Sequence, residues 1–177
     1  MPTYVSANGS DFLSTLIQEN PKGLSLGINT KVDNLGVAMG NGSQALGKTS
    51  TAMGNGSLAL GENSTAMGFS TIATGEASTA MGSTSRASGR ASTAMGFNAT
   101  TLGDYSTAMG NSTLAIGLES TAMGSSWANG NYSTAMGSLT KANGDYSTAM
   151  GAGSQASGWT STAMGYMTQA NGDCSTA

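Results

Sequence analysis

The sequence predicts an all-β protein, a parallel β-solenoid of 14-residue coils with two short strands each. Ten of the 12 methionines recur with a 14-residue spacing, apart from one 13-residue step between Met123 and Met136. The repeated unit reads Gly-x-x-Ser/Thr-x-Ala-x-Gly-x-x-Ser-Thr-Ala-Met, so two segments with strand-like alternation lie between two Gly-x-x turns. A fixed period of this kind indicates a stack of repeats rather than a globular domain.

The composition agrees with a repeat array. Charged residues make up 8% and aromatic residues 6% of the 177 residues, and Gly, Ser, Thr, Ala and Asn dominate, so an ordinary globular core is not expected. The formal net charge is -3 and the Lys and Arg residues are scattered, which predicts no nucleic-acid partner. No apolar run reaches the roughly 18 residues of a membrane span, so this segment is not expected to insert into a membrane.

Other structures with a related period fit the sequence poorly. A 14-residue period is also two heptads, but two glycines per unit would cost a helix about 2 kcal/mol relative to alanine. Collagen requires Gly at every third residue, and the calcium-binding roll requires a recurring Gly-Gly-x-Gly-x-Asp, and neither pattern is present. The remaining interpretation is a parallel β-solenoid with two strands per coil and coils stacked about 4.8 Å apart.

The alternation within each segment predicts which side chains face the interior. In the first segment, Ser/Thr-x-Ala-x, the variable positions include Arg86 and Lys141, so these positions are expected outside and Ser/Thr and Ala inside. For Ser-Thr-Ala-Met, either Thr and Met or Ser and Ala face inward. We expect Thr and Met inside, because a Met opposite an Ala fills the space between two sheets. Ser and Ala would then form a flat outer strip that packs against further copies in a closed assembly.

The methionines of this segment form the predicted structural ladder. Each enclosed Met would contribute about 1.5 to 3 kcal/mol of burial, so replacement of Met109 by Asp is expected to prevent folding. The ladder comprises Met53, Met67, Met81, Met95, Met109, Met123, Met136, Met150 and Met164.

Apolar residues at the variable positions form a candidate contact surface for a partner. One stripe lies in the early coils, and a second lies beside the 13-residue unit, Gly124 to Met136. Packing against a neighbouring subunit is an equally good interpretation of both stripes. The candidate residues are Leu58, Leu60, Ile72, Leu114, Ile116 and Trp127.

The residues that support catalysis or bind cofactors are largely missing. The chain has no His and one Cys, and the Asp and Glu residues at its turns are one coil or more apart. These features predict no catalytic site, no metal site and no cofactor. Residues 1–26 do not follow the repeat or read as a secretory signal, and we interpret them as a cap or attachment segment. Residues 27–177 form the expected roll of about ten coils, which ends within a repeat.

The repeat resembles the head repeats of trimeric autotransporter adhesins, whose units look like Gly-x-x-Ser-x-Ala-x-Gly-x-x-Ser-Val-Ala-Ile. The unit GSLTKANGDYSTAM, Gly137 to Met150, follows this pattern except that Thr148 replaces Val and Met150 replaces Ile. The resemblance covers residues from about 40 to 177. It implies a left-handed parallel β-roll that forms a homotrimer and serves as an adhesive head on a bacterial surface. Similar rolls are plausible in viral or phage fibres.

The expected function is therefore a non-enzymatic structural and adhesive rod or head. Its partners would be two further copies of itself and a surface receptor, matrix or glycan that contacts the variable outer strands. The expected location is extracellular, on a cell surface or in a virion fibre. Two alternatives remain open, namely an ice-binding solenoid that uses a flat Ser/Thr/Ala face and a mechanical spacer that binds nothing.

Overall fold

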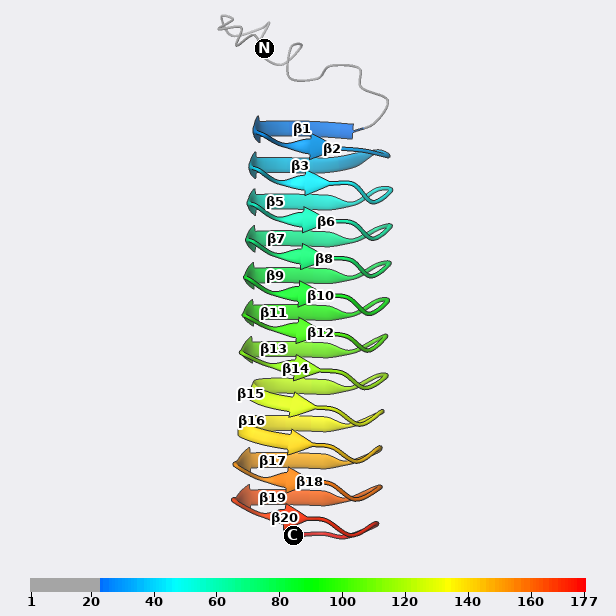
Figure 1. The fold of residues 1–177 in the computed structure, drawn as a ribbon, viewed down its shortest axis with the longest axis vertical. Coiled ribbons are helices and arrows are strands. Elements are labelled where there is room, and N and C mark those ends of the chain that lie inside the picture. The colour runs from blue at the N-terminus through cyan, green and yellow to red at the C-terminus, as the bar shows by residue number, and fades with distance from the viewer. Residues whose placement is uncertain (1–22) are drawn as a thin grey trace, which may run out of the picture.

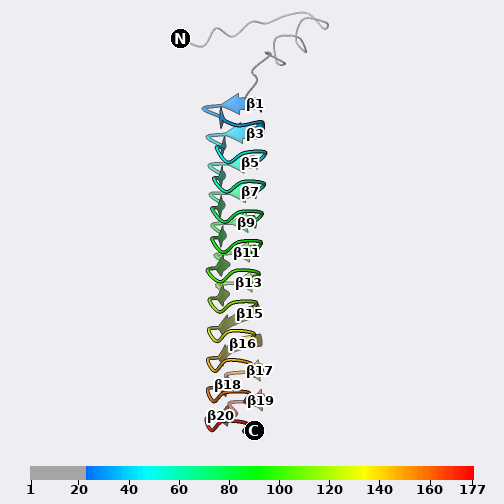
Figure 2. The same cartoon turned by 90° about the vertical axis from the view of Figure 1, so that its right-hand side faces the viewer.

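Successive coils lie one above another in a single column (Figure 1), and every pairing between their strands is parallel. The computed structural model describes residues 23–177, in which all the regular elements are strands. Met95 of one coil lies beside Met109 of the next, and the same 14-residue step recurs through most of the column. The predicted fold class, a parallel β-solenoid of 14-residue coils, is confirmed. Figure 2 shows the narrow side of this column.

Each coil contributes a long and a short strand segment, and in two coils these segments merge into one strand. The long strands are β1 (Gly23–Ile28), β3 (Gly36–Asn41), β5 (Thr51–Asn55), β7 (Thr65–Phe69), β9 (Thr79–Ser83), β11 (Thr93–Phe97), β13 (Thr107–Asn111), β17 (Thr148–Ala152) and β19 (Thr162–Tyr166). The short strands are β2 (Lys31–Val32), β4 (Gln44–Ala45), β6 (Leu58–Ala59), β8 (Ile72–Ala73), β10 (Arg86–Ala87), β12 (Thr100–Thr101), β14 (Leu114–Ala115), β18 (Gln155–Ala156) and β20 (Gln169–Ala170). The merged strands are β15 (Thr121–Ala128) and β16 (Thr134–Ala142).

The roll begins earlier than the sequence pattern indicated. Gly23 in β1 pairs with Gly36 in β3, so residues 23–26, which were expected to belong to the cap, already form part of the first coil. The expected role of the N-terminal segment as a cap stays a prediction, because residues 1–22 lie outside the described part of the chain.

The fully buried side chains of the roll are all small. They are alanines, serines and threonines that are at most 1% exposed. In the short strands they are the Ser/Thr and Ala positions, such as Ser85 and Ala87, as predicted. In the long strands they are the Ser and Ala of Ser-Thr-Ala-Met, such as Ser92 and Ala94. The core is therefore a layer of alanine methyl groups and hydroxyl groups that runs the length of the column.

The prediction that Thr and Met fill the interior is wrong. Thr93 and Met95 lie on the outer side of β11 and are only partly buried. The space between the two sheets is too narrow for Met, because a Cβ atom on Gly36 of β3 would lie 3.0 Å from the Cβ atom of Ala45 in β4. That gap accommodates about one methyl group from each side, so the longer side chains point outward. The Ser and Ala strip that was expected on the surface is the core.

Several of the inward serines donate hydrogen bonds to turn carbonyls, whereas the hydroxyls of Ser64, Ser120, Ser133 and Ser147 have no such partner. Ser92 Oγ donates a hydrogen bond of 2.7 Å to the carbonyl oxygen of Gly89 in the preceding turn. At the other turn, Ser57 Oγ lies 3.0 Å from the carbonyl oxygen of Met53 and 2.9 Å from that of Gly68 in the next coil. Buried carbonyls are normally hydrogen-bonded, so a small hydroxyl side chain suits these positions better than a purely apolar one.

Two columns of glycine allow the coils to stack. At one turn, Gly54 has φ +119°, and a Cβ atom there would lie 2.0 Å from the carbonyl oxygen of Gly68. At the other turn, a Cβ atom on Gly61 would lie 2.0 Å from the carbonyl oxygen of Gly75. Neither distance is compatible with a side chain, so the Gly of each Gly-x-x turn is required by the close approach of the next coil's backbone.

Candidate functional site

The outer surface of the long strands, which we call the Thr–Met face, is the same in almost every coil. Its residues pair in register from coil to coil, as Thr107 and Met109 do with Thr121 and Met123. Nine coil steps of about 4.8 Å separate Met39 from Met164, so the face is about 43 Å long. The face consists of Thr51, Thr65, Thr79, Thr93, Thr107, Thr121, Thr134, Thr148, Thr162, Met39, Met53, Met67, Met81, Met95, Met109, Met123, Met136, Met150 and Met164.

The Thr–Met face is uncharged and partly exposed in the single chain. Its methionines from Met53 to Met150 are partly buried by their neighbours in the ladder, whereas Met164 in the last full coil is 50% exposed. The Thr and Met columns are about 7 Å apart, so the face covers about 300 Å². Exposed apolar patches of several hundred Å² on a soluble protein often mark a contact surface.

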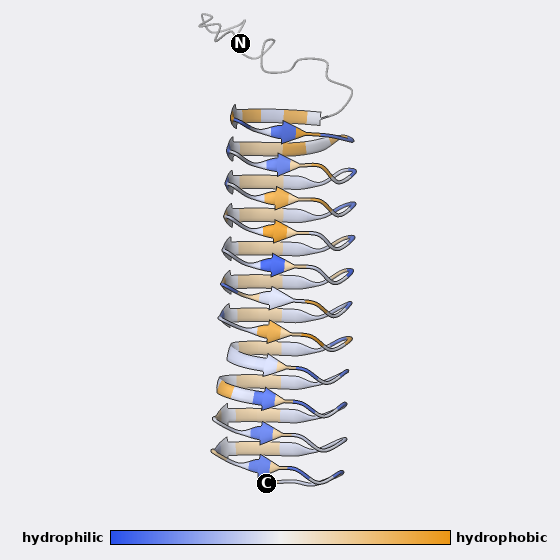
Figure 3. Cartoon of the chain, in the orientation of Figure 1, coloured by the Kyte–Doolittle hydropathy of each residue, from blue (hydrophilic) through white to orange (hydrophobic). Residues whose placement is uncertain are grey.

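The outer surface of the short strands, which we call the variable face, changes from coil to coil. It includes the outward residues that follow Ser/Thr and Ala in the first segment of each repeat. Figure 3 shows this difference, because most of the long strands repeat one hydropathy pattern while the short strands vary between hydrophobic and hydrophilic. The constant and variable faces lie on opposite sides of the thin core.

The six residues of the candidate contact surface form two separate groups on the variable face. Leu58 lies beside Ile72 in the early coils. Leu114 lies beside Trp127 further along the column. Arg86 and Thr100 occupy the two coils between Ile72 and Leu114 and separate the groups. The most exposed members are Leu60, Ile116 and Trp127, at 41%, 41% and 43%.

The 13-residue coil produces a groove next to Trp127. Its lining comes from this coil and the two that follow, and its volume is about 290 Å³. Lys141 lies beside Trp127 in the neighbouring strand, with its Nζ atom 4.6 Å from the centre of the indole ring. Among the described residues, no carboxylate forms an ion pair with Lys141. The groove is lined by Ser125, Trp127, Leu139, Thr140, Lys141, Gly153, Ser154 and Gln155.

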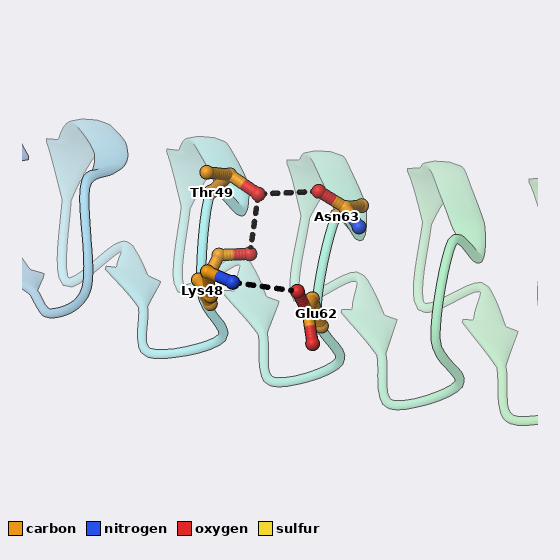
Figure 4. A network of polar contacts seen from close by, with 4 residues as sticks. All are labelled: Lys48, Thr49, Glu62 and Asn63. Carbon is orange, nitrogen blue, oxygen red and sulfur yellow. Dashed lines mark hydrogen bonds and ion pairs between the residues drawn. The ribbon is translucent and has the colours of Figure 1, made fainter.

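The second turn of each coil forms an edge with polar contacts between coils. Figure 4 shows one such contact, in which Lys48 Nζ lies 3.3 Å from Glu62 Oε1 and the hydroxyl of Thr49 donates to the side-chain oxygen of Asn63. Further along the edge, Asp145 Oδ1 accepts a hydrogen bond of 2.8 Å from the backbone N–H of Asn131. Acidic and amide side chains at this turn thus cap backbone donors of the preceding coil.

The same edge carries an exposed aromatic cluster. The rings of Tyr132 and Tyr146 stack with their centres 4.9 Å apart, and Trp159 lies edge-on to Tyr146 at 6.3 Å. All three residues are between 41% and 53% exposed. Tyr105 lies outside this cluster and contacts the guanidinium of Arg90, 5.0 Å from the ring centre.

The described residues contain no group of three or more His, Cys, Asp or Glu side chains that could hold a metal ion. Cys174, the one cysteine of the chain, is exposed and free. Within residues 23–177, no helix has the length and apolar character needed to cross a membrane.

A thin parallel solenoid with one constant and one variable face is a repeat protein built to present a surface. The family model of the YadA head domain repeat matches residues 35–57, 59–85, 87–113, 115–140, 128–154 and 156–177. These matches cover more than half of the chain, which therefore belongs to the YadA head-repeat family of trimeric autotransporter adhesins. The resemblance seen in the sequence is confirmed. None of the curated proteins compared with the chain matches it.

Membership of this family places the chain among adhesin-type structural proteins. YadA-like adhesins are extracellular surface proteins, and the family is in general not enzymatic. The family also carries a general expectation of homotrimers that bind surfaces.

Proposed function

We propose that this chain is the adhesive and structural part of a homotrimeric rod, in which three copies pack through their Thr–Met faces. The observation that carries the proposal is the continuous register of Thr and Met on one uncharged face, as at Met95 and Met109. A face that repeats in every coil lets identical copies make the same contact along the whole length of the column. The variable face lies on the other side of each roll and is left to contact a partner.

The energetics of a single roll support this arrangement. Alanine and serine side chains fill the core, so it buries little apolar surface per coil. Removal of the remaining exposed surface of each Met from water would contribute about 1 kcal/mol. Ten such residues per chain give on the order of 10 kcal/mol for each subunit, which is comparable to the stability of a whole domain.

The adhesive role is assigned to the variable face. Residues there differ in size, charge and aromatic character, as at Ile72, Arg86 and Trp127. A surface that varies while its scaffold stays constant suits recognition of a partner, such as a receptor, a matrix protein or a glycan. We place the rod outside the cell, on a cell surface or in a virion fibre.

Solution mass by light scattering tests the proposal. We expect a particle of three times 17.4 kDa that does not dissociate on dilution to the micromolar range. A stable monomer with the β-rich spectrum of a folded chain would contradict the trimeric rod.

Ice binding remains the second candidate, and one observation favours it. The threonines of the long strands lie on the outer face in register, as Thr93 and Thr107 do, instead of in the core. Such a column presents hydroxyl groups at a regular spacing of about 4.8 Å. This function requires the Thr–Met face to be free in solution, so it predicts a monomer and a measurable gap between freezing and melting points. A trimer without such a gap, and without any surface partner, would favour the mechanical spacer.

A further inference from the structure

We propose that the groove beside Trp127 binds a pyranose sugar that carries a carboxylate, as part of a surface glycan. The proposal rests on the adhesive function above, because it assigns a ligand class to one part of the variable face. It depends on the origin of the groove, on the chemistry of its walls and on the charge of Lys141.

The groove exists because one corner residue is missing from the 13-residue coil. In neighbouring coils, Ser112 and Leu139 stand at this corner with φ of 55° and 56°. The corresponding turn of the short coil runs from Gly124 through Ser125 directly into Ser126. Strand β15 runs through this shortened turn to Ala128, and it has no residue equivalent to Ser112 or Leu139 at the corner beside Trp127.

A side-chain hydrogen bond replaces the backbone hydrogen bond that the shortened turn lacks. In a regular coil, the backbone N–H of the corner residue donates to the preceding coil, as Ser112 does to the carbonyl oxygen of Phe97 at 2.8 Å. The short coil has no such N–H, and Ser125 Oγ donates to the carbonyl oxygen of Asn111 instead, at 2.9 Å. The shortened turn is thus part of a hydrogen-bonded coil rather than a local break in the roll.

The walls of the groove suit one sugar ring. Trp127 and Leu139 form apolar walls and are 43% and 72% exposed, so each presents a free surface to solvent. Gln155 adds an amide, whose nitrogen donates to Ser157 Oγ at 2.9 Å while its carbonyl oxygen has no partner among the described residues. The volume of about 290 Å³ lies at the lower end of small-molecule sites. A pyranose has apolar C–H faces and a rim of hydroxyl groups, which matches this combination of walls.

The charge of the groove selects an anionic ligand. Lys141 is the only charged residue of the lining, and its ammonium group is held 4.6 Å from the centre of the Trp127 ring. Within residues 23–177 it has no carboxylate partner. The indole ring attracts the ammonium group, which favours this position of the Lys141 side chain. A carboxylate on the sugar would supply the missing counter-charge beside an apolar wall.

Three grooves in a trimer would act together. Each one, with a volume near that of a single ring, is expected to bind weakly, in the millimolar range. Simultaneous contact of several grooves with one glycan-coated surface would raise the apparent affinity by about 10² or more. A weak single site is therefore compatible with firm adhesion.

The experiment uses the full chain with Trp159→Phe, so that Trp127 is the one remaining tryptophan and reports binding by its fluorescence. The probes are the methyl glycosides of glucuronic acid and of sialic acid, which distinguish the two common sources of an acidic sugar. Methyl glucoside tests the ring without the charge, and acetate and a glutamate-rich peptide test the charge without the ring. We expect saturable binding of at least one acidic glycoside and at least tenfold weaker binding of the other three probes.

Matched variants connect the binding to the groove. Lys141→Gln is expected to weaken binding at least tenfold, and Arg86→Gln, in the same column of the variable face, to leave it unchanged. Insertion of Asn between Ser125 and Ser126 restores the full-length coil and is expected to abolish binding. Gln already occupies this column at Gln155, so Lys141→Gln is expected to fold normally, which circular dichroism checks.

The outcomes separate this inference from the proposed function. Absence of a saturable response to both acidic glycosides, equal binding of the peptide, or an equal effect of Arg86→Gln would overturn the groove as an acidic-sugar site. Light scattering on the same samples reports the trimer independently. A trimer that binds neither glycoside would support the trimeric rod and contradict only the acidic-sugar site.

Discussion

A Cβ atom placed on Gly89 would lie 1.9 Å from the carbonyl oxygen of Gly103, one coil further along the column. The stacking distance of the coils therefore leaves no room for a side chain at this turn. We expect Gly89→Ala to destabilise the roll by about 3 kcal/mol or more, because two backbones would have to separate. Chemical unfolding followed by circular dichroism measures the change.

Gly56→Asn is the matched control for Gly89→Ala. Gly56 has a positive φ of +66°, unlike Gly89, and a Cβ atom there meets nothing closer than Ser70 Oγ at 3.5 Å. Asn98 occupies the equivalent corner in another coil with φ of 53°. We expect a change of less than about 1 kcal/mol. Equal destabilisation by both substitutions would mean that close contact with the next coil adds no cost at Gly89.

The orientation of Ser-Thr-Ala-Met leads to a second prediction. Ala94 is fully buried, and Met95 lies on the outer face. Ala94→Leu adds three carbon atoms to a core that holds one methyl group from each side, so we expect a loss of at least about 3 kcal/mol. Met95→Leu conserves volume at the surface and is expected to change stability by less than about 1 kcal/mol. If thermal unfolding ranked the two variants in the opposite order, Met would have to face the interior.

Much of the fold follows from the sequence because a repeat fixes its own register. The 14-residue period determines the coil, and the charges of Arg86 and Lys141 place the variable positions outside. The second segment carries no charge in any coil, so the same argument gave no answer there. The expectation of a thicker core then placed Thr and Met inside in place of Ser and Ala, which is wrong.

The first coils contain residues that indicate which side of the Ser-Thr-Ala-Met segment faces inward. In β3, Val37 stands where later coils have Thr, and in β1, Leu26 stands where they have Met, so these positions tolerate large apolar residues. The inward positions of the long strands hold only Gly, Ser or Ala, as at Gly36 and Ala38. A limit on side-chain size marks the interior of a thin roll better than hydrophobicity does.

The groove beside Trp127 could be only half-predicted from the sequence. The 13-residue unit and its Trp are visible in the repeat pattern. The position of Lys141 over the indole ring is not, because it depends on the register across the shortened turn between Ser125 and Trp127. Which coils line the groove follows from the same register.

The Thr–Met face gives a third prediction, on assembly. Met109 lies on the outer side of β13, so Met109→Asp is compatible with a folded roll, contrary to the expectation for an internal residue. In a trimer the same change would place three carboxylates at one level of the interface without partners. We expect a folded chain with the mass of a monomer, measured by circular dichroism and light scattering.

Thr100→Asp is the control for Met109→Asp. Thr100 lies on the variable face of β12, between Arg86 and Leu114 in neighbouring coils. The added carboxylate faces solvent there, so we expect the trimer to persist. Dissociation caused by Thr100→Asp but not by Met109→Asp would assign the interface to the variable face.

The aromatic cluster on the turn edge gives a fourth prediction. Tyr146 stacks on Tyr132 and contacts the edge of Trp159. Ala91 occupies the same turn position in another coil with φ of 51°, so Tyr146→Ala removes the ring contacts without a new backbone requirement. Each aromatic pair contributes about 0.5 to 1.5 kcal/mol, which predicts a loss of about 1 to 3 kcal/mol in urea unfolding.

Tyr105→Ala provides the comparison for Tyr146→Ala. Tyr105 contacts one cation, the guanidinium of Arg90, at an exposed site. Such a contact contributes about 0.5 to 1 kcal/mol, so the loss should be smaller than for Tyr146→Ala. Equal losses for the two variants would show that the stacked cluster adds no stability of its own.

The ion pair of Figure 4 gives the last prediction, on salt dependence. Lys48 and Glu62 approach to 3.3 Å, but their side chains are 64% and 49% exposed, so water and salt screen the pair. Glu62→Gln is expected to lower stability by less than about 0.5 kcal/mol. Close ion pairs are rare among residues 23–177, so the unfolding midpoint should change little between low salt and about 0.5 M sodium chloride. A large fall in the midpoint with added salt would indicate that charges contribute to the roll or its assembly, against an interface made of Thr and Met.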